Sequence, residues 1–304
     1  MSLPCLEALL ASGSPVVVCA RPWAEDLLSS YPIKGFVPVS GKLWHDWQSV
    51  RSYRRKHHHS DPRGLLLPDS LSSAIIFRLA GIPSAGHKDD GRQLLLRWPL
   101  DKARSAQHAV QAWYRLTLLS MQAWGFSSAT PLAPPRELKL RLSNNHYDAA
   151  QQLIKQQAIH TNSTILIAPT AVGRHHGKNK VWEGFEALTK ALQAQGFTVV
   201  MCPPPAEREQ ALANAPSAVC LPSLSLGGFA ALAKSCKLVV CNDSGVSHIA
   251  AAVGANQLTL FGVTNRKRTG PWSPHAQCLG SEMGWPTVEE VVAKIQTLMA
   301  KGAT

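Results

Sequence analysis

The feature that most constrains the fold is the alternation of predicted strands and helices in the second half of the chain. Short apolar runs, typical of buried strands, are each followed by a longer segment with apolar residues at helical spacing. This alternation predicts a parallel sheet that helices cover on both faces. The predicted elements are the strands 164–168, 198–202, 218–221, 237–241 and 257–261 and the helices 182–195, 225–235, 246–253 and 288–300.

The first half has the same pattern in a weaker form. The segment 51–63 is rich in Arg, Lys and His and predicts an exposed connection between elements. The predicted elements around it are helix 3–10, strand 16–19, strand 64–67, helix 72–79 and helix 107–125.

Length and proline content predict two domains joined by a linker. A chain of 304 residues is long enough for two domains of ordinary size. Pro131, Pro134 and Pro135 stand between the two patterned halves, as is typical of a linker. We therefore expect an α/β fold of two Rossmann-like, doubly wound parallel-sheet domains that face each other across a cleft. The expected parts are an N-terminal domain at 1–130, a linker and helix at 131–160, a C-terminal domain at 161–285 and a final helix at 286–304.

The charge balance points to an anionic partner. The chain has 31 Lys and Arg against 19 Asp and Glu, a formal net charge of +12. Nucleic acid, phosphorylated small molecules and an anionic membrane surface all fit such an excess. No zinc finger, helix-turn-helix or RNP pattern accompanies it, which disfavours nucleic acid. No apolar run approaches the roughly 20 residues of a membrane-spanning helix, so no such span is expected.

Cysteine usage and the first residues predict a reducing compartment. The seven cysteines form no C-x-x-C pair and lie mostly in apolar runs, so we expect buried, reduced thiols. The start MSLPCLEALLASGS lacks the basic region of a secretory signal and carries Glu7 within its apolar stretch. We therefore expect a cytoplasmic protein.

The most informative segment is 237–262, where an apolar strand runs into Asn-Asp-Ser-Gly and then into an alanine-rich helix. Ligands of doubly wound sheets bind at the carboxyl ends of strands, and helix starts attract phosphate. Ser244 and Gly245 are placed to offer main-chain amides, and Asp243 to accept hydrogen bonds from sugar hydroxyls. Two alternatives stay open: Asp243 or Ser244 caps the helix, and His248 is a core histidine bonded to Asp243.

A second segment, 165–185, also leads from a strand through a loop into a helix. The Walker spacing GxxxxGK[ST] is absent, yet cationic side chains over a helix start suit a diphosphate leaving group. The adjacent histidines have no third ligand at metal-binding spacing, so no metal site is expected. The basic residues of this loop are Arg174, His175, His176, Lys178 and Lys180.

Two glutamates, Glu207 and Glu209, follow the strand 198–202 at the start of a helix. Acidic side chains there favour the helix dipole. A carboxylate that binds the ribose of a nucleotide is the functional alternative, and the spacing favours neither.

These segments, in this order, resemble glycosyltransferase family 9, the ADP-heptose:lipopolysaccharide heptosyltransferases. NDSGVSHIAAAVG followed by LTLFGVTNRKRTGPW is similar to that family's pattern of D-[ST]-G-x-x-H-x-A-A-x-x-G, a strand, F-G-x-T and a proline with an aromatic residue. Lys180-Val181-Trp182 resembles its donor-loop lysine motif, and LPDSLSSAIIFRLAGI resembles its Ser-x-x-Ala and Leu-Ala-Gly element. The similarity extends over nearly the whole chain.

The resemblance implies a GT-B architecture, with a nucleotide sugar bound mainly by the C-terminal domain and the acceptor by the N-terminal one. It also implies no metal and no cofactor, because a lysine and helix amides take the charge that a divalent ion otherwise bears. By position it implies that Thr170 and Lys180 contact the diphosphate or sugar and that Lys180 acts in catalysis. It places Glu209, with Glu207 beside it, at the ribose and Leu224 at the adenine. It places four residues on the floor of the donor site: Asp243, Ser244, Gly245 and His248.

One family element is missing from the sequence given. In the family, the first strand ends in a Gly-Asp loop whose aspartate deprotonates the acceptor hydroxyl, and this sequence begins in the helix after that loop, at Ser2-Leu3-Pro4. Two accounts stay open: the complete protein carries one more strand and loop, or the chain is naturally short and at best weakly active. Asp69, after the strand 64–67, is the remaining candidate base, and a helix cap explains it equally well.

We therefore expect an inverting transferase that moves heptose from ADP-heptose to the phosphorylated Kdo and inner-core region of lipopolysaccharide, at the cytoplasmic face of the inner membrane. The alternatives are another nucleotide-sugar donor on the same fold and a catalytically silent donor-binding protein. The expected partners are the donor, a lipid A–Kdo acceptor and an anionic membrane surface, without nucleic acid. Acceptor phosphates or lipid head groups are expected at Arg51, Arg54, Arg55, Lys56 and Arg63, each of which a solvated loop explains as well.

Overall fold

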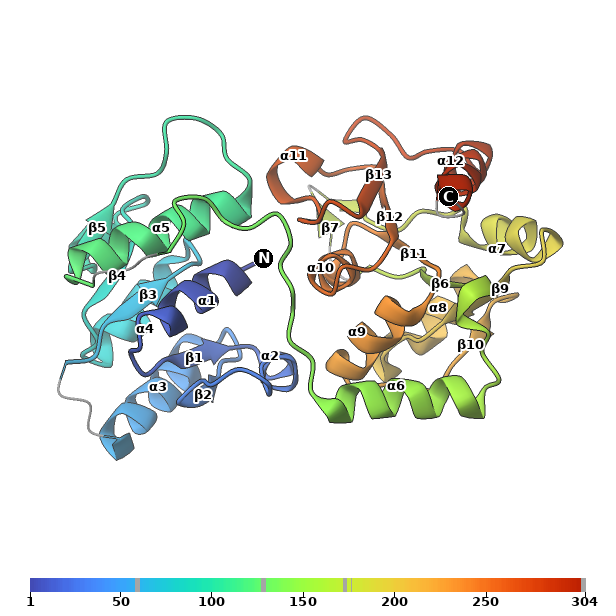
Figure 1. Ribbon diagram of the computed structural model, residues 1–304. Coiled ribbons are helices and arrows are strands. Elements are labelled where there is room, and N and C mark those ends of the chain that lie inside the picture. Colours follow the sequence, from blue (N-terminus) through green and yellow to red (C-terminus); the bar gives the residue numbers. More distant parts are fainter. Residues whose placement is uncertain (58–60, 127–129, 172–173, 176, 302–304) are drawn as a thin grey trace. The chain divides into compact units, whose positions relative to one another are not determined.

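The strands of the second half lie side by side in one parallel sheet in the computed structural model of the protein (Figure 1). The structure describes residues 1–57, 61–126, 130–171, 174–175 and 177–301. In spatial order the strands are β10 (Val219–Cys220), β9 (Thr198–Met201), β6 (Thr164–Ala168), β11 (Leu238–Asn242), β12 (Gln257–Phe261) and β13 (Ala276–Gly280). The five predicted strands are confirmed to within one residue at each end, and β13 is an additional, half-buried edge strand.

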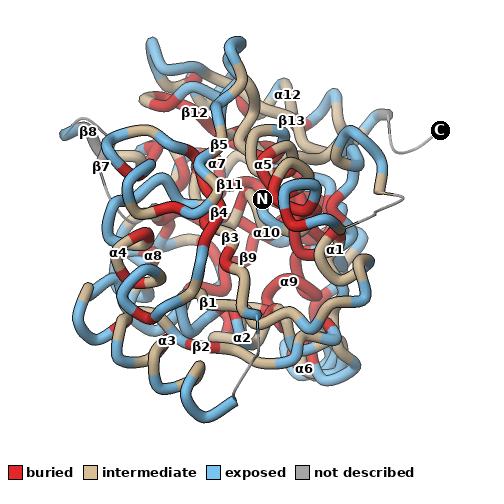
Figure 2. Tube along the Cα trace, turned by 90° about the vertical axis from the view of Figure 1, so that its left-hand side faces the viewer, coloured by how far each residue is buried: buried red, intermediate tan, exposed pale blue. Residues whose placement is uncertain are grey.

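Helices cover this sheet on both faces because its side chains alternate between two apolar cores. Figure 2 colours the chain by burial, with buried residues in red and exposed residues in pale blue. Ile165 and Ile167 of β6 pack with α7 (Phe185–Ala194), α8 (Arg208–Asn214) and α12 (Val288–Lys301). Leu166 and Ala168 pack on the other side with α6 (Asn144–Gln156), α9 (Leu226–Ser235) and α10 (Gly245–Ala252). The predicted doubly wound α/β class is confirmed.

The strand order creates one switch point in the sheet. From β6 the chain moves outward to β9 and β10, then returns to place β11 on the opposite side of β6. Connections therefore leave the carboxyl ends of β6 and β11 in opposite directions, and ligands of doubly wound sheets bind at such a point.

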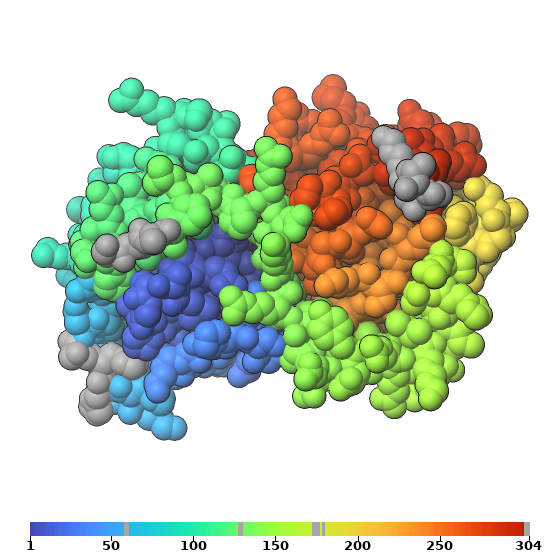
Figure 3. All heavy atoms as spheres, in the orientation of Figure 1, coloured from blue at the N-terminus to red at the C-terminus, as the bar shows by residue number. Residues whose placement is uncertain are grey.

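The chain divides into two compact units, Met1–Pro135 and Arg136–Thr304, coloured in sequence order in Figure 3. The division falls at the end of the proline-rich segment predicted as a linker. Helix α6, which the prediction grouped with that linker, belongs to the second unit, where Ala150 and Leu153 enter the sheet's core.

The first unit is built from short parallel strands in two sheets. One contains β1 (Val17–Ala20) and β2 (Gly35–Pro38), and the other contains β3 (Gly64–Leu66), β4 (Ser84–His87) and β5 (Trp98–Leu100). These strand pairings do not test whether the family's first strand is missing, so that statement stays a prediction. The helices of this unit are α1 (Leu3–Ala11), α2 (Trp23–Leu27), α3 (Leu43–His57), α4 (Leu71–Leu79) and α5 (Ala109–Ala123).

The prediction that 51–63 is an exposed connection is wrong for its first part, because residues up to His57 belong to helix α3. The helix is amphipathic: Trp47 and Val50 pack in an apolar cluster with β2 and α4, while Arg55, Lys56 and His57 are exposed. The sequence window began in the middle of this helix, so the apolar stripe that starts at Leu43 was cut off. Residues 58–60 lie outside the described part of the chain.

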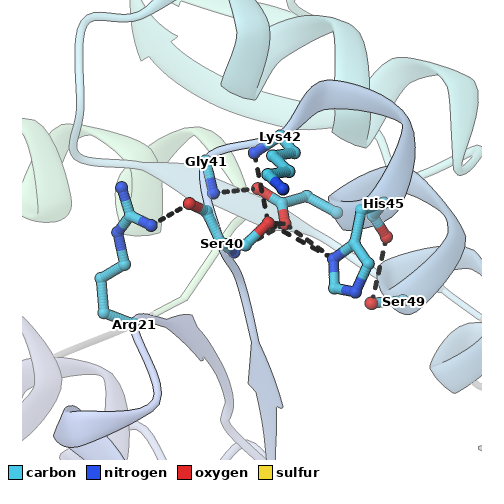
Figure 4. A network of polar contacts seen from close by, with 7 residues as sticks. Arg21, Ser40, Gly41, Lys42, His45 and Ser49 are labelled. Atoms are coloured by element: carbon cyan, nitrogen blue, oxygen red, sulfur yellow. Dashed lines mark hydrogen bonds and ion pairs between the residues drawn. The ribbon is translucent and has the colours of Figure 1, made fainter.

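A buried carboxylate fixes the turn that leads from β2 into α3 (Figure 4). Asp46 accepts hydrogen bonds from the amides of Ser40 and Gly41, both at 2.7 Å, and from the Ser40 hydroxyl at 2.9 Å. Arg21 donates to the Ser40 carbonyl from the other side. Burial alone would raise the pKa of Asp46, but the hydrogen bonds from Ser40 and Gly41 outweigh it and hold that pKa below its ordinary value.

Replacing Asp46 by alanine is expected to lower the free energy of unfolding by about 2 to 3 kcal/mol at pH 7, because two amides lose their acceptor. The folded-state pKa is lowered, so the carboxylate stabilises the fold above its ordinary pKa near 4 and loses that effect as the pH falls through the lowered value. Urea unfolding of both proteins from pH 7 to pH 2.5 measures this. A difference in stability that stays constant below pH 4 would contradict the assignment.

Candidate functional site

A buried carboxylate stands at the carboxyl end of β11, beside the switch point of the sheet. Asp243 is 5% exposed, and its Oδ2 accepts a hydrogen bond of 2.6 Å from the hydroxyl of Thr264, which follows β12. The same oxygen lies 3.7 Å from Nζ of Lys180. The structure therefore brings together two residues that the sequence predicted separately, and adds Thr264 from the F-G-x-T motif.

The start of helix α10 carries a hydroxyl without a partner. Ser244 is the N-cap residue, yet its side chain makes no capping bond, and its Oγ is buried with no hydrogen-bond partner among the described residues. A buried polar group left unpaired costs about 1 to 3 kcal/mol, which a ligand oxygen at this point would recover. Asp243 does not cap the helix in place of Ser244, because its Oδ2 binds Thr264. The alternative that Asp243 or Ser244 caps the helix is therefore wrong for both side chains.

The next residues of α10 leave the site open. Gly245 is exposed, and a Cβ atom at this position would meet no atom within 4 Å. His248 lies half-buried one turn further along. The absence of a side chain at Gly245 therefore keeps the helix start accessible, and no neighbouring atom in the described part of the chain requires a glycine there.

A hydrogen bond joins the carboxyl ends of β6 and β9. The hydroxyl of Thr170 donates to Glu207, the N-cap residue of α8. Glu209 lies in the first turn of that helix and is exposed. Leu224, after β10, is half-buried and packs against the core next to α9. Both explanations of the acidic pair stay open: the glutamates lie at a helix start, and they also follow the carboxyl end of β9.

Sequence analysis missed Asn242, the last residue of β11. Its side-chain oxygen accepts from the amide of Trp182 at 3.0 Å, and its nitrogen donates to the carbonyl of Thr170 at 3.3 Å. The only available signal was a polar residue at the end of an apolar strand, and its partners lie 60 and 72 residues away. Helix α7 begins at Phe185, with Gly184 as its N-cap residue, rather than at the predicted residue 182. Trp182 belongs to the preceding loop, where its amide is bonded to Asn242.

The basic loop before Lys180 is only partly described. Strands β7 (Arg174–His175) and β8 (Lys178–Asn179) pair as an antiparallel hairpin, and their side chains lie outside the description, as does all of His176. Over the described ranges, no group of three or more His, Cys, Asp or Glu side chains is arranged to hold a metal ion.

The candidate base Asp69 lies in a cluster of basic side chains in the first unit. Its carboxylate is 3.0 Å from His87 Nδ1, 2.9 Å from Lys102 Nζ and 3.4 Å from Arg92 Nη1. Burial alone would raise the pKa of Asp69, but the hydrogen bonds from Lys102 and His87 outweigh it and lower that pKa. The helix-cap alternative is wrong, because the cap of α4 is Ser70, whose hydroxyl accepts from the amide of Ser73 at 3.3 Å.

The five basic residues expected at the acceptor divide into three kinds. Arg54 donates to the carbonyl of Ala80 at 2.6 Å, and Arg63 donates to the carbonyl of Trp124 at 2.5 Å, so both hold the first unit together. Arg51 lies over the ring of Trp47, with 5.0 Å from its guanidinium carbon to the ring centre. Arg55 and Lys56 are exposed on the last turn of α3. Only these last two are fully presented to solvent.

All seven cysteines are free thiols that are buried or half-buried, as the sequence predicted. Burial raises the pKa of Cys202 to about 11 and that of Cys241 to about 12. Thiols with such pKa values are poor nucleophiles at neutral pH, so the cysteines pack the core.

Comparison with known proteins agrees with the fold and the motifs. The family model described as glycosyltransferase family 9 (heptosyltransferase) matches residues 57–295. Lipopolysaccharide heptosyltransferase 2 of Escherichia coli K12 is 26% identical over 300 residues, covering 90% of this chain and 81% of that protein. Lipopolysaccharide heptosyltransferase 1 of Pseudomonas aeruginosa is 40% identical over 80 residues, which are 22% of that protein.

Solved structures give the same architecture. The ADP-heptose heptosyltransferase II of E. coli superposes with a TM-score of 0.73 at 22% identity, covering 99% of this chain and 96% of that chain. An E. coli heptosyltransferase determined with ADP gives 0.72 at 19% identity, covering 98% and 95%. These likenesses define the GT-B class of two Rossmann-like domains.

The chain belongs to glycosyltransferase family 9, the heptosyltransferase family. It is a glycosyltransferase, and the strand-end site of the second unit lies within the matched residues. Among the helices described here, none is both long and apolar enough to cross a bilayer.

Proposed function

We propose that this protein transfers heptose from ADP-heptose to the Kdo and heptose region of the lipopolysaccharide inner core, with inversion at the anomeric carbon. The observation that carries the proposal is the cluster of Lys180, Asp243 and Thr264 beside the unpartnered hydroxyl of Ser244. A cation, a helix start and a buried hydrogen-bond acceptor at the switch point suit a sugar linked to a diphosphate. The names of the relatives support the choice of sugar.

Each residue has a role in this proposal. Lys180 and the amides at the start of α10, with Ser244 and Gly245, stabilise the negative charge that develops on the leaving ADP. Asp243 orients the sugar hydroxyls, and His248 completes the floor of the site. Thr170 borders the diphosphate, and Leu224 borders the adenine. The proposal needs no metal ion and no cofactor, because these groups supply the compensating charge.

The carboxylate that binds the ribose is chosen by which of the two glutamates has no other partner among the residues described at the site. Glu207 is engaged by Thr170, whereas Glu209 is exposed in the first turn of α8. We therefore assign the ribose hydroxyls to Glu209, with Glu207 holding the edge of the site through Thr170.

The catalytic base stays unassigned. A general base works best with a pKa near the operating pH, and the cations around Asp69 lower its pKa instead. Asp69 is accordingly better suited to hold His87 and Lys102 in place than to take a proton from the acceptor.

Release of the nucleoside diphosphate tests the donor: ADP is released from ADP-heptose, and UDP from UDP-N-acetylglucosamine. The protein is incubated with ADP-heptose, or with UDP-N-acetylglucosamine as the competing donor, each with and without lipid A–Kdo acceptor. Acceptor-dependent ADP release from ADP-heptose is the expected result. Turnover only with the other donor would replace the proposed sugar, and binding of ADP-heptose without turnover would favour a donor-binding protein.

We propose that the acceptor and the anionic membrane surface meet the last turn of α3, on the cytoplasmic face of the inner membrane. Arg55 and Lys56 are exposed there, whereas Arg54 and Arg63 are bonded to main-chain carbonyls. Lysine and arginine at an anionic membrane surface contribute about 1 kcal/mol each.

Reversing both exposed charges, Arg55→Glu with Lys56→Glu, is expected to raise the acceptor KM at least about tenfold at low salt, because two attractions become repulsions. The donor KM should not change. Lys155→Glu is the control, since this lysine is equally exposed on a helix of the second unit. An unchanged acceptor KM in the double variant would overturn this assignment.

A further inference from the structure

We infer that Asn242 is a positioning residue for Lys180: its side-chain amide fixes both ends of the main-chain segment that carries the lysine over the strand-end site. The inference rests on the proposed function to the extent that Lys180 acts on the donor.

The contacts of Asn242 come from both sides of this segment. Its Oδ1 accepts from the amide of Trp182 at 3.0 Å, and its Nδ2 donates to the carbonyl of Thr170 at 3.3 Å. Thr170 is where the segment leaves β6, and Trp182 is where it returns to the core, two residues after Lys180. One side chain therefore closes the loop at its two ends.

The chemistry of the contact requires a carboxamide. An amide offers an acceptor and donors on adjacent atoms, whereas a carboxylate only accepts and an aliphatic side chain does neither. Asn242 is fully buried at the end of a strand whose preceding residues are apolar. An apolar residue of equal size would fill the space but leave the amide of Trp182 and the carbonyl of Thr170 without this partner, so the amide does more than fill space.

Trp182, where the segment returns to the core, is itself held in place, so the hydrogen bond from its amide to Asn242 can fix the main chain. Trp182 is 4% exposed, its ring nitrogen donates to the carbonyl of Pro286 at 2.8 Å, and its ring packs edge-on against Phe185. With the main chain fixed at this point, Lys180 lies two residues upstream and reaches Asp243 at 3.7 Å.

The last residue of β11 and the residue after it therefore hold the lysine in two ways. Asn242 fixes its main chain, and Asp243 attracts its ammonium group. A displacement of about 1 Å of a catalytic group can lower a rate about 10²-fold, so loosening the main-chain clamp should act on kcat through Lys180. A purely structural asparagine would affect stability and nothing that depends on the lysine.

A double-mutant cycle separates these two roles. Asn242→Leu is expected to lower kcat about 10-fold or more, with a smaller change in donor KM. In the Lys180→Ala background the same substitution should lower kcat less than about twofold, because its effect passes through the lysine. Losses that multiply independently in the double variant would overturn the inference.

Gln257→Leu is the matched control for the structural part. Gln257 is also a fully buried amide of the same sheet, but it lies at the amino end of β12, where its Nε2 donates to Thr259 at 3.1 Å. It should leave kcat unchanged. Its Oε1 has no hydrogen-bond partner among the described residues, so the change in stability should be small.

A readout without substrate keeps this inference separate from the proposed function. Hydrogen exchange of a peptide spanning residues 178–185 should accelerate about tenfold or more in Asn242→Leu under native conditions, because the Trp182 amide loses its acceptor. The same peptide should be unchanged in Gln257→Leu. If the wild type transfers no heptose, the proposed function fails while this result still stands; unchanged exchange in Asn242→Leu would overturn the clamp.

Discussion

Replacing Lys180 by alanine is expected to lower kcat/KM for sugar transfer by about 10²- to 10³-fold, the loss typical of removing one group that stabilises developing charge. The leaving ADP gains negative charge as the glycosidic bond breaks. Without the ammonium group, the Asp243 carboxylate, now 3.7 Å from it, would face the diphosphate unopposed. The variant should therefore weaken donor binding as well as slow the chemical step, and steady-state kinetics with varied ADP-heptose measures both.

The control for this variant is Lys190→Ala. Lys190 is an exposed lysine of α7 in the same unit, paired with Glu186 one turn away at 3.1 Å, and surface pairs of this kind contribute little. Both variants should retain the wild-type melting temperature to within a few degrees. Full activity of Lys180→Ala would remove the lysine from the site and leave the charge of the leaving group to other residues.

The second unit was the more predictable part of the fold because its strands are buried on both faces. Strands such as Thr164–Ala168 and Gln257–Phe261 are apolar runs with clear breaks, and they occur where the sequence placed them. The strands of the first unit that were missed contain Gly, Pro, Ser or His, as in GFVP and SAGH, so composition did not distinguish them from turns. Helix α3 was missed because its C-terminal part is so basic that the segment 51–63, taken alone, was interpreted as a loop.

The site was predictable only as far as topology dictates it. The carboxyl ends of parallel strands share one edge of a sheet, so motifs after separate strands had to converge, as Lys180 and Asp243 do. The bond between Thr170 and Glu207 and the clamp of Asn242 depend instead on side-chain geometry over separations of 37 to 72 residues. Spacing along the chain carries no signal for such pairs. For the same reason the sequence did not predict the basic residues around Asp69. They lower the pKa of its carboxyl and so make it less suited to act as a base.

Replacing Gly245 by leucine is expected to abolish donor binding while leaving the fold as stable as before. A Cβ atom here meets nothing within 4 Å, and leucine at the start of α10 has a higher helix propensity than glycine, so the free energy of unfolding should stay equal or rise by up to about 1 kcal/mol. The added side chain projects from the exposed helix start, where we place the diphosphate. Titration calorimetry with ADP should then find at least about 100-fold weaker binding, or about 2.7 kcal/mol.

Gly227→Ala should give the opposite combination, which makes the pair informative. A Cβ atom at Gly227 would lie 2.3 Å from the ring of His146, a buried residue of α6 whose position the Ser143 capping box fixes. This variant should lose about 1 to 3 kcal/mol of stability through overpacking and bind ADP as wild type does while folded. Unimpaired ADP binding by Gly245→Leu would place the diphosphate away from α10. Because one variant should lose binding without losing stability, and the other should lose stability without losing binding, general unfolding cannot produce the expected pattern.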